Sequence, residues 1–348
     1  MADIKVIIPM AGIGKRFAPL THHRPKPLLR LTDQRLLDHV LDIFQPLEET
    51  YALQYVFIIG YLGEQIKEYM QNAHPKKNVA YYEQKQLGGQ SHAVYLAKDA
   101  VSGPMLLTYC DTITATDFST LKSDSRDGIV WVHHVNDPRR HGVAVMDSGN
   151  LVKKLVEKPN TTEHTWALTG LCYFPDGKKL IEAIETQLER GTSINNEYYL
   201  ADAINILLEN GAHIRTERAL QWLDSGTPEA ILETNAYLLQ HSRESHPRSA
   251  VDPSNIFIDP VYVHESAQIR DSIIGPNVSI GANCTIHRSI IKNTIVDSES
   301  NITDVSLDYS LIGQACSISG SRKRLLAADR EEIAYAGDET IPSRGALA

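Results

Sequence analysis

Long apolar runs, secretion signals and paired cysteines are all missing from this sequence. None of its 348 residues lies in an uninterrupted apolar run of the roughly 18 to 20 residues that a membrane-spanning helix needs. The first nine residues carry Asp3 and Lys5 and lack the long apolar stretch and cleavage site of a signal peptide. The four cysteines form no CxxC pair, which argues against a structural zinc site and indicates free thiols in a reducing compartment. We therefore expect a cytoplasmic protein that does not associate with a membrane.

Positive charge is also scarce, except in one place. The net charge of −9 argues against nucleic-acid binding, for which a basic surface is the usual footprint. Between positions 15 and 30, however, there is no acidic residue, and the basic ones are Lys15, Arg16, His22, His23, Arg24, Lys26 and Arg30. A local positive field on an acidic protein attracts small anionic molecules.

The first 240 residues alternate apolar strands with helices. We predict strands at 4–9, 55–60, 80–84 and 105–110, and helices at 36–44, 64–70 and 91–100. This alternation is typical of an α/β fold with a Rossmann-like, parallel or mixed sheet. Ligands of such sheets bind beyond the carboxyl ends of the strands, where we expect a glycine loop, Gln84 and Asp111.

A mixed pattern follows and completes a first domain over residues 1–240. It predicts strands at 128–135, 142–147, 151–159, 171–174 and 222–224, and helices at 178–190, 197–209 and 227–240. The polar residues 241–255 carry no apolar periodicity and are interpreted as a linker.

Residues 256–320 follow a different rule. Apolar residues recur there at steps of five or six, at Val263, Ile269, Ile274, Ile280, Ile286, Ile291, Val296, Ile302, Leu307, Ile312 and Ile318. An antiparallel sheet does not explain these steps, because one face of a strand repeats every two residues. A period near six predicts a left-handed β-helix of about three coils. The remaining residues, 321–348, are interpreted as a polar tail.

The loop after the first strand is the strongest motif. Gly12 and Gly14 allow backbone N–H groups to approach phosphate oxygens closely. Arg16 and Lys26 follow this loop. The guanidinium group of Arg16 can bind the β- and γ-phosphates in a bidentate way, and Lys26 offers a fixed positive charge. The sequence is neither a P-loop, which needs Ser or Thr after its lysine, nor a dinucleotide fingerprint, which needs a third glycine where Phe17 stands.

With these residues in the pattern glycine loop–Arg–PKPL, the chain resembles the sugar-1-phosphate nucleotidylyltransferases from residue 4 to about 240. It looks most like the glucose-1-phosphate thymidylyltransferases, and a hexapeptide β-helix also occurs in several branches of that family. The resemblance implies a Mg²⁺-dependent enzyme that joins an NTP, dTTP in this branch, to a sugar 1-phosphate such as glucose 1-phosphate. We also expect a homo-oligomer, because flat coil faces stack readily.

The resemblance assigns the nucleotide to two segments. The residues that match its nucleotide site are Ala11, Gly12, Gly14, Lys15, Arg16, Gln84 and Gly89. An amide donates and accepts together, so Gln84 suits the O4 and N3–H edge of thymine or uracil. Without the resemblance, a solvated glutamine at a strand end is the better interpretation.

Two aspartates match the family's metal ligands. Asp111 follows the 105–110 strand, and Asp224 ends the segment W-L-D. Two carboxylates from separate strand ends can share one Mg²⁺ and leave positions for phosphate oxygens, although each alone is more often a turn or cap residue. Cys110 departs from the glycine that the family commonly has there.

The sugar site is implied by three further segments. The matching residues are Gly142, Glu157, Lys158, Leu168, Thr169 and Gly170. In the family, Glu157 would accept hydrogen bonds from sugar hydroxyls and Lys158 would contact the sugar phosphate. Glu197 and Asp202 are given at most a supporting role.

The implied reaction is an in-line attack by the sugar phosphate on the α-phosphorus, with Arg16, Lys26, Asp111 and Asp224 as the catalytic set. UTP or another sugar remains an alternative. A non-catalytic paralogue is disfavoured, because the chain keeps these four residues. Acyl transfer by the β-helix, with His264 or His287 as the base, is disfavoured by the small number of coils.

Overall fold

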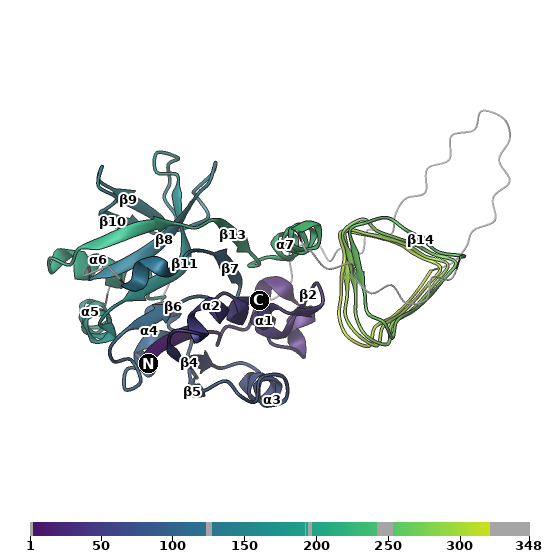
Figure 1. Cartoon of the computed structure of the whole chain (residues 1–348), viewed down its shortest axis with the longest axis horizontal. Coiled ribbons are helices and arrows are strands. Elements are labelled where there is room, and N and C mark those ends of the chain that lie inside the picture. Colours follow the sequence, from purple (N-terminus) through teal and green to yellow (C-terminus); the bar gives the residue numbers. More distant parts are fainter. Residues whose placement is uncertain (1–2, 123–126, 192, 194–196, 242–252, 321–348) are drawn as a thin grey trace.

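The structure, a computed structural model, describes residues 3–122, 127–191, 193, 197–241 and 253–320. It has two parts, an α/β domain and a triangular β-helix, with the helix α7 (Pro228–His241) and the strand β2 (Arg30–Leu31) lying between them (Figure 1). Most of the predicted linker, residues 242–252, and the predicted tail at 321–348 lie outside the described residues.

A nine-stranded mixed sheet forms the centre of the α/β domain. Its path runs β10-β9-β11-β6-β1-β4-β5, and β8 joins β12 to β11. The neighbours β1 and β4, β4 and β5, and β1 and β6 are parallel, whereas β11 pairs antiparallel with β6. The strands are β1 (Asp3–Pro9), β4 (Ala52–Ile59), β5 (Val79–Glu83), β6 (Met105–Leu107), β8 (Gly128–His134), β9 (Val143–Met146), β10 (Val152–Val156), β11 (Trp166–Phe174) and β12 (Ile214–Arg218). The predicted α/β fold with a mixed sheet is confirmed.

Two short strand pairs lie outside this sheet. One joins β7 (Thr112–Ala115) to β13 (Gln221–Asp224), and the other joins β2 to β3 (Gln34–Arg35). The strands β7 and β12 were not predicted. The first is four residues long with two threonines, and the second carries three charged residues among five, so neither shows an apolar run.

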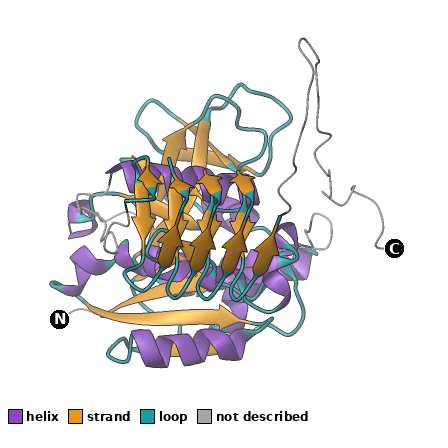
Figure 2. Ribbon diagram, turned by 90° about the vertical axis from the view of Figure 1, so that its right-hand side faces the viewer, coloured by secondary structure: helices purple, strands orange, loops and turns teal. Residues whose placement is uncertain are grey.

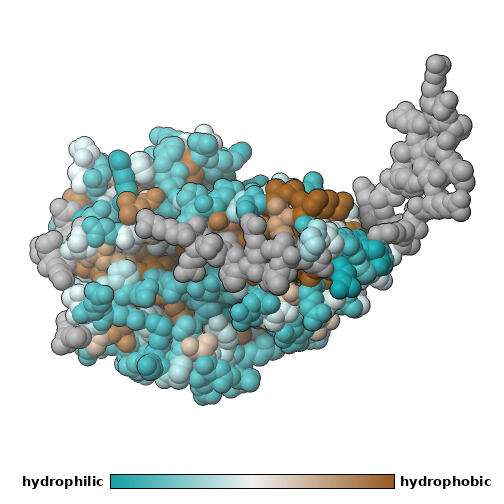
Figure 3. Space-filling view, turned by 45° about the vertical axis from the view of Figure 1, so that its right-hand side comes forward, coloured by the Kyte–Doolittle hydropathy of each residue, from teal (hydrophilic) through white to brown (hydrophobic). Residues whose placement is uncertain are grey.

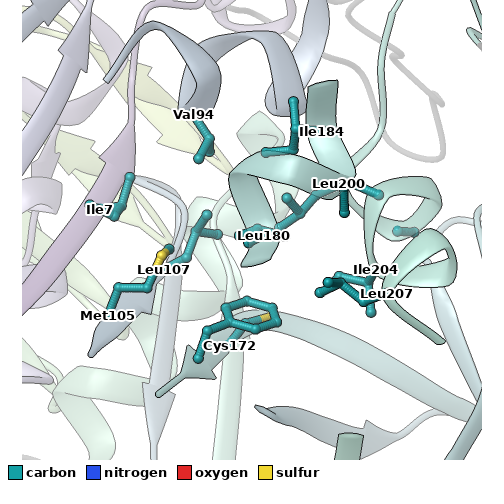
Figure 4. Close-up of a cluster of buried hydrophobic side chains, with 14 of the residues drawn as sticks. Ile7, Val94, Met105, Leu107, Cys172, Leu180, Ile184, Leu200, Ile204 and Leu207 are labelled. Atoms are coloured by element: carbon teal, nitrogen blue, oxygen red, sulfur yellow. The ribbon is translucent and has the colours of Figure 1, made fainter. Parts of the chain in front are cut away.

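Helices cover both faces of the sheet. They are α1 (Leu36–Asp42), α2 (Gln45–Glu48), α3 (Gly63–Ala73), α4 (Gly89–Leu96), α5 (Gly177–Arg190) and α6 (Leu200–Glu209), whereas α7 packs beside β13, β2 and β18 (Val278–Ile280). Strand alternation sorts the core: Val6 and Ile8 pack with α1 and α3, whereas Ile7 faces the cluster formed by α4, α5 and α6 (Figure 4). Two predicted helices have different ends in the structure. The helix predicted at 91–100 begins earlier and ends at Leu96, and the helix predicted at 197–209 begins only at Leu200.

The β-helix consists of three parallel sheets of four strands each (Figure 2). The strands are β14 (Ile256–Phe257), β15 (Val261–Val263), β16 (Gln268–Arg270), β17 (Ile273–Ile274), β18 (Val278–Ile280), β19 (Thr285–His287), β20 (Ile290–Lys292), β21 (Ile295–Val296), β22 (Asn301–Thr303), β23 (Ser306–Asp308), β24 (Leu311–Ile312) and β25 (Ser317–Ser319). The predicted inward positions from Val263 to Ile302 are all buried, as expected of a left-handed β-helix. The estimate of about three coils was too low, because β14 adds a strand before the first predicted apolar position.

The surface is largely hydrophilic in the view of Figure 3, with hydrophobic residues gathered in a few patches. None of the described helices is both long and apolar enough to cross a membrane. All four cysteines lie in described residues and are free, as predicted.

Candidate active site

The carboxyl ends of the parallel strands meet at one edge of the sheet and open onto a cleft. Its volume is about 810 Å³, which suits a small-molecule site. The sequence-predicted residues that line it are Ala11, Gly12, Gly14, Arg16, Lys26, Gln84, Gly89, Asp111, Gly142, Glu157, Lys158, Leu168, Thr169, Gly170 and Asp224. One predicted residue, Lys15, is exposed and not among those lining residues.

The glycine loop leaves β1 and ends in a 3-10 turn over Lys15–Phe17. Gly14 has φ 71°, a left-handed conformation, and its carbonyl accepts a hydrogen bond of 3.0 Å from Thr21 Oγ1. Consecutive side chains of a 3-10 turn point about 120° apart. With Phe17 in the core and Arg16 at the cleft, Lys15 therefore points to solvent. A β-carbon at Gly12 would meet nothing within 4 Å, so the backbone there borders open space.

Two carboxylates and a lysine lie together at the centre of the cleft. Lys26, which is 7% exposed, places Nζ 2.5 Å from Asp111 Oδ2. Asp224 pairs with Thr112 across β13 and β7, and Ser225 N donates to Asp111 O at 2.8 Å. The predicted proximity of the two aspartates thus follows from a strand pair that the sequence did not reveal.

The electrostatics of the two carboxylates differ. Burial alone would raise the pKa of Asp111, but Lys26 and then Arg16 hold it below its ordinary value. The pKa of Asp224 is raised, first by burial and then by the charge of Asp111. Lys26 and Arg16 thus favour the charged form of Asp111, whereas a bound cation would relieve the repulsion that raises the pKa of Asp224. Mg²⁺ is commonly bound by one or two carboxylates together with substrate phosphates, so this pair fits such an ion.

The predicted base-reading residue is held by its own neighbours. Gln84 directly follows β5 and is 5% exposed, and its backbone N–H donates to Ile59 O at 2.8 Å. Its Nε2 lies 3.2 Å from Gly89 O and 3.1 Å from His92 Nδ1. The Nε2 atom therefore has partners within the protein, and the expectation that this amide group both donates and accepts toward a base stays a prediction.

Gly89 brings the start of α4 against a neighbouring segment. Its φ is +89°, and a β-carbon there would lie 2.5 Å from Tyr198 N. Ser91 N also donates to Tyr198 O at 3.0 Å. The close approach is possible only with glycine.

The other end of the cleft is formed by β9, β10 and β11. A β-carbon at Gly142 would lie 3.0 Å from Glu157 Oε2 and 3.1 Å from Leu168 Cδ1, so glycine keeps this wall open. Burial raises the pKa of Glu157, although Lys158 opposes the shift. Lys158 Nζ lies 5.3 Å from the centre of the Tyr199 ring. Leu168, Thr169 and Gly170 lie within β11, which begins earlier than predicted.

Several lining residues were not predicted. His141 and Trp222 lie with ring centres 4.9 Å apart, and the other unpredicted lining residues include Tyr109, Arg140, Leu155 and Ile204. A signal existed for two of them, since His141 directly precedes Gly142 and Trp222 stands two residues before Asp224. Of the two supporting residues, Glu197 lines the cleft and Asp202 is not among the lining residues.

An α/β domain with a cationic glycine loop and two carboxylates at the carboxyl edge of its sheet defines a nucleotidyltransferase. The chain belongs to the nucleotidyl transferase family, whose model matches residues 5–241. A second model, the GMPPB C-terminal domain, matches residues 257–325 and thus covers the β-helix.

Curated relatives cover both domains. The chain is 29% identical over 338 residues to the bifunctional protein GlmU of Methanocaldococcus jannaschii. The matched region covers 89% of this chain and 78% of that protein. It is also 29% identical over 350 residues to a glucose-1-phosphate thymidylyltransferase of Streptomyces antibioticus, with 91% and 94% covered.

A solved structure of UDP-glucose pyrophosphorylase with UDP-glucose shares the fold, with a TM-score of 0.59 at 20% identity over 70% of this chain and 100% of that chain. A structure described as a putative glucose-1-phosphate thymidylyltransferase, from Bacillus anthracis, matches with a TM-score of 0.57 at 21% identity, over 67% and 94% of the two chains.

Proposed function

We propose that this chain is a Mg²⁺-dependent sugar-1-phosphate nucleotidyltransferase that converts dTTP and glucose 1-phosphate to dTDP-glucose and pyrophosphate. One observation supports this most strongly. A single cleft is lined at its centre by the glycine loop with Arg16, Lys26 and the two carboxylates, and elsewhere by Glu157 and Lys158. Such a cleft can bring two anionic substrates together.

The reaction is a direct displacement at phosphorus. An oxygen of the sugar phosphate attacks the α-phosphorus of the triphosphate, a new P–O bond forms, and the bond to the β-phosphate oxygen breaks. Pyrophosphate carries away the electron pair. Because the attacking oxygen is already anionic, no side chain has to remove a proton, and the protein acts by positioning and charge neutralisation.

The residues of the chain divide this work. The glycine loop and Arg16 bind the triphosphate, and Arg16 stabilises the pyrophosphate that leaves. Lys26 and Lys158 offset the repulsion between the two incoming phosphates, and Glu157 orients the sugar by accepting from its hydroxyls. Asp111 and Asp224 would hold Mg²⁺, which supplies charge neutralisation at the reacting phosphates when it is bound.

The choice of substrates rests on less. Gln84 and Gly89 both line the cleft, which supports the proposal that they read a pyrimidine edge, and the names of relatives include glucose-1-phosphate thymidylyltransferase. A UTP-dependent or other-sugar enzyme is the alternative, since a GlmU protein is equally similar in sequence. Acyl transfer by the β-helix is not proposed. Its two candidate histidines already have partners within the β-helix, since His264 contacts Ser266 and His287 contacts Asp271.

A substrate grid tests the proposal. Pyrophosphate release would be measured for dTTP, UTP, CTP, ATP and GTP, each with glucose 1-phosphate, N-acetylglucosamine 1-phosphate and mannose 1-phosphate. We expect dTTP with glucose 1-phosphate to have the highest kcat/KM and to need a divalent cation. A higher value for UTP or another sugar would keep the reaction but correct the substrates, and no release from any pair would refute the function.

A further inference from the structure

One carboxylate of the β-helix reaches into the α/β domain. Asp297 directly follows β21, and its side chain is 6% exposed. Its Oδ2 accepts a hydrogen bond of 2.7 Å from Arg35 Nη1 and another from Arg24 Nη1. Its Oδ1 accepts from Ser298 N at 2.8 Å, so the carboxylate is held in place from the β-helix side.

Both arginines bracket the turn that carries Lys26. Arg24 stands two residues before Lys26, which begins the 3-10 turn Lys26–Leu28. Arg35 Nη1, besides its bond to Asp297, donates to Leu28 O at 3.2 Å at the other end of that turn. The two ends of the turn are therefore tied to one carboxylate in the other domain.

Apolar contacts support the same connection. Phe17, next to Arg16, belongs to a cluster that includes Ile295 of β21 and, partly buried, Leu311 of β24. Lys26 Nζ lies 5.1 Å from the centre of the Phe17 ring. The β-helix thus packs behind Arg16 and Lys26.

The charges at this junction depend on Asp297. Arg24, Arg30 and Arg35 gather around it, and Arg30 lies over the Tyr262 ring at 5.5 Å. Although burial alone would raise the pKa of Asp297, Arg35 and Arg24 hold it below its ordinary value. Without this negative charge, the guanidinium groups would repel one another and the turn between them would lose the attachment that both arginines share. Among the polar contacts of Arg24 with the described part of the β-helix, only the bond from its Nη2 to Gln314 Oε1 would remain.

We propose that Asp297 is a positioning residue for the reaction: through Arg24 and Arg35, the β-helix fixes the turn that places Lys26 beside Asp111. This inference rests on the proposed function for its catalytic consequence, but the positioning itself can be measured without turnover. The β-helix then has a role in the chemistry of the cleft, although it supplies none of the cleft's lining residues.

The test compares Asp297→Asn with a matched control in the full-length chain. Asp304→Asn is the control, because Asp304 accepts two bonds of 2.7 and 2.6 Å from Arg288, also within the β-helix. Steady-state kinetics would be measured well below the unfolding temperature of each variant. We expect Asp297→Asn to lower kcat roughly 10- to 100-fold, the scale of a misplacement of about 1 Å, and Asp304→Asn to change it less than about twofold.

A second readout does not depend on activity. Amide hydrogen exchange in peptides that cover residues 20–31 should rise in Asp297→Asn and stay unchanged in Asp304→Asn. Measured beside Arg35→Gln alone, the double variant Arg35→Gln/Asp297→Asn should lose less kcat than the two single losses multiplied together, because both substitutions break the same connection, although Arg35→Gln also removes the bond to Leu28 O.

Three results would overturn the inference: a wild-type kcat and exchange pattern in Asp297→Asn, an equal loss of kcat in Asp304→Asn, or a fully additive double variant. If the wild-type chain is inactive with every substrate pair, the proposed function fails. The exchange measurement then still decides whether Asp297 holds the turn.

Discussion

Asp111 and Asp224 reach the same place from opposite directions along the chain. Asp111 directly precedes β7 and Asp224 ends its antiparallel partner β13, which brings both to the position of Lys26. Lys26 and Arg16 together offset the charge of the pair, and the proposed Mg²⁺ would offset the charge that a triphosphate brings to it. The charges of these side chains therefore determine what can bind at the centre of the cleft.

Removing one charge of the pair should stop the reaction without unfolding the protein. In Asp111→Asn we expect pyrophosphate release to fall at least about 10²- to 10³-fold, since a preorganised electrostatic contact is lost where charge develops. Asp117→Asn is the control, because that residue is exposed and its carboxylate bonds only Ser119 in the described contacts. Near-normal turnover of Asp111→Asn would remove this residue from the catalytic centre.

The two ends of the cleft should separate in kinetics. Glu157→Gln should raise KM for the sugar 1-phosphate about tenfold and leave KM for the triphosphate within about twofold, because it weakens a hydrogen bond to a charged acceptor. Gln84→Ala should instead raise KM for the triphosphate and leave KM for the sugar 1-phosphate within about twofold. If both variants raise the same KM, the assignment of the two ends is wrong.

At the scale of elements, the sequence predicted what periodicity encodes. The apolar strands β1, β4 and β5 and the inward positions of the β-helix were found, because their side chains repeat in step with the backbone. It did not predict β7, whose partner lies about a hundred residues along the chain. The site residues in glycine-rich and charged motifs were located, whereas the misplaced Lys15 depended on the phase of a single 3-10 turn.

The start of α4 offers a test at this scale. Gly89→Ala adds a β-carbon 2.5 Å from Tyr198 N and should displace the helix start that binds Gln84. Gly103→Ala is the matched control, since Gly103 also has a positive φ, +70°, but nothing within 4 Å. In both variants the free energy of unfolding should fall by about 1–2 kcal/mol, because alanine is strained in the left-handed conformation.

Only Gly89→Ala should also raise KM for the triphosphate and lower the unfolding temperature beyond the control. Kinetics and differential scanning calorimetry would measure the two effects. Equal behaviour of the two variants would mean that the contact with Tyr198 does not shape the nucleotide site.

Across the whole molecule, the two domains are joined by buried polar contacts as well as apolar ones. Asn235 of α7 accepts from Thr32 N at 3.0 Å and from Ser279 Oγ of β18 at 2.7 Å, and Asp297 binds its two arginines nearby. These contacts couple β2, α7 and the β-helix. The homo-oligomer expected from the flat coil faces remains a prediction.

The ion pairs of Asp297 should make stability depend on pH in a defined direction. Because its folded pKa lies below that of an unfolded aspartate, about 3.9, its contribution is present above that pH and is lost as pH falls through the folded pKa. Breaking a buried pair of this kind costs on the order of 3–5 kcal/mol. Wild type should therefore unfold at a higher temperature than Asp297→Asn near pH 6.

The difference between the two proteins should shrink below about pH 4, and calorimetry from pH 3 to 7 would measure it. Arg24, Arg30, Arg35 and Cys284 interact electrostatically with this carboxylate, and Tyr262 and Glu299 act on Arg30 and Arg24 in turn. A difference that is constant over this range would show that the charge of Asp297 does not contribute.

The most direct test of the central claim is the position of the metal in a substrate complex. Crystals of the full chain grown with Mn²⁺ and a non-hydrolysable dTTP analogue would be measured at a wavelength where manganese scatters anomalously. The account predicts one anomalous peak at about 2 Å from carboxylate oxygens of both Asp111 and Asp224, in contact with the triphosphate. A metal bound to the triphosphate but to neither aspartate would contradict it.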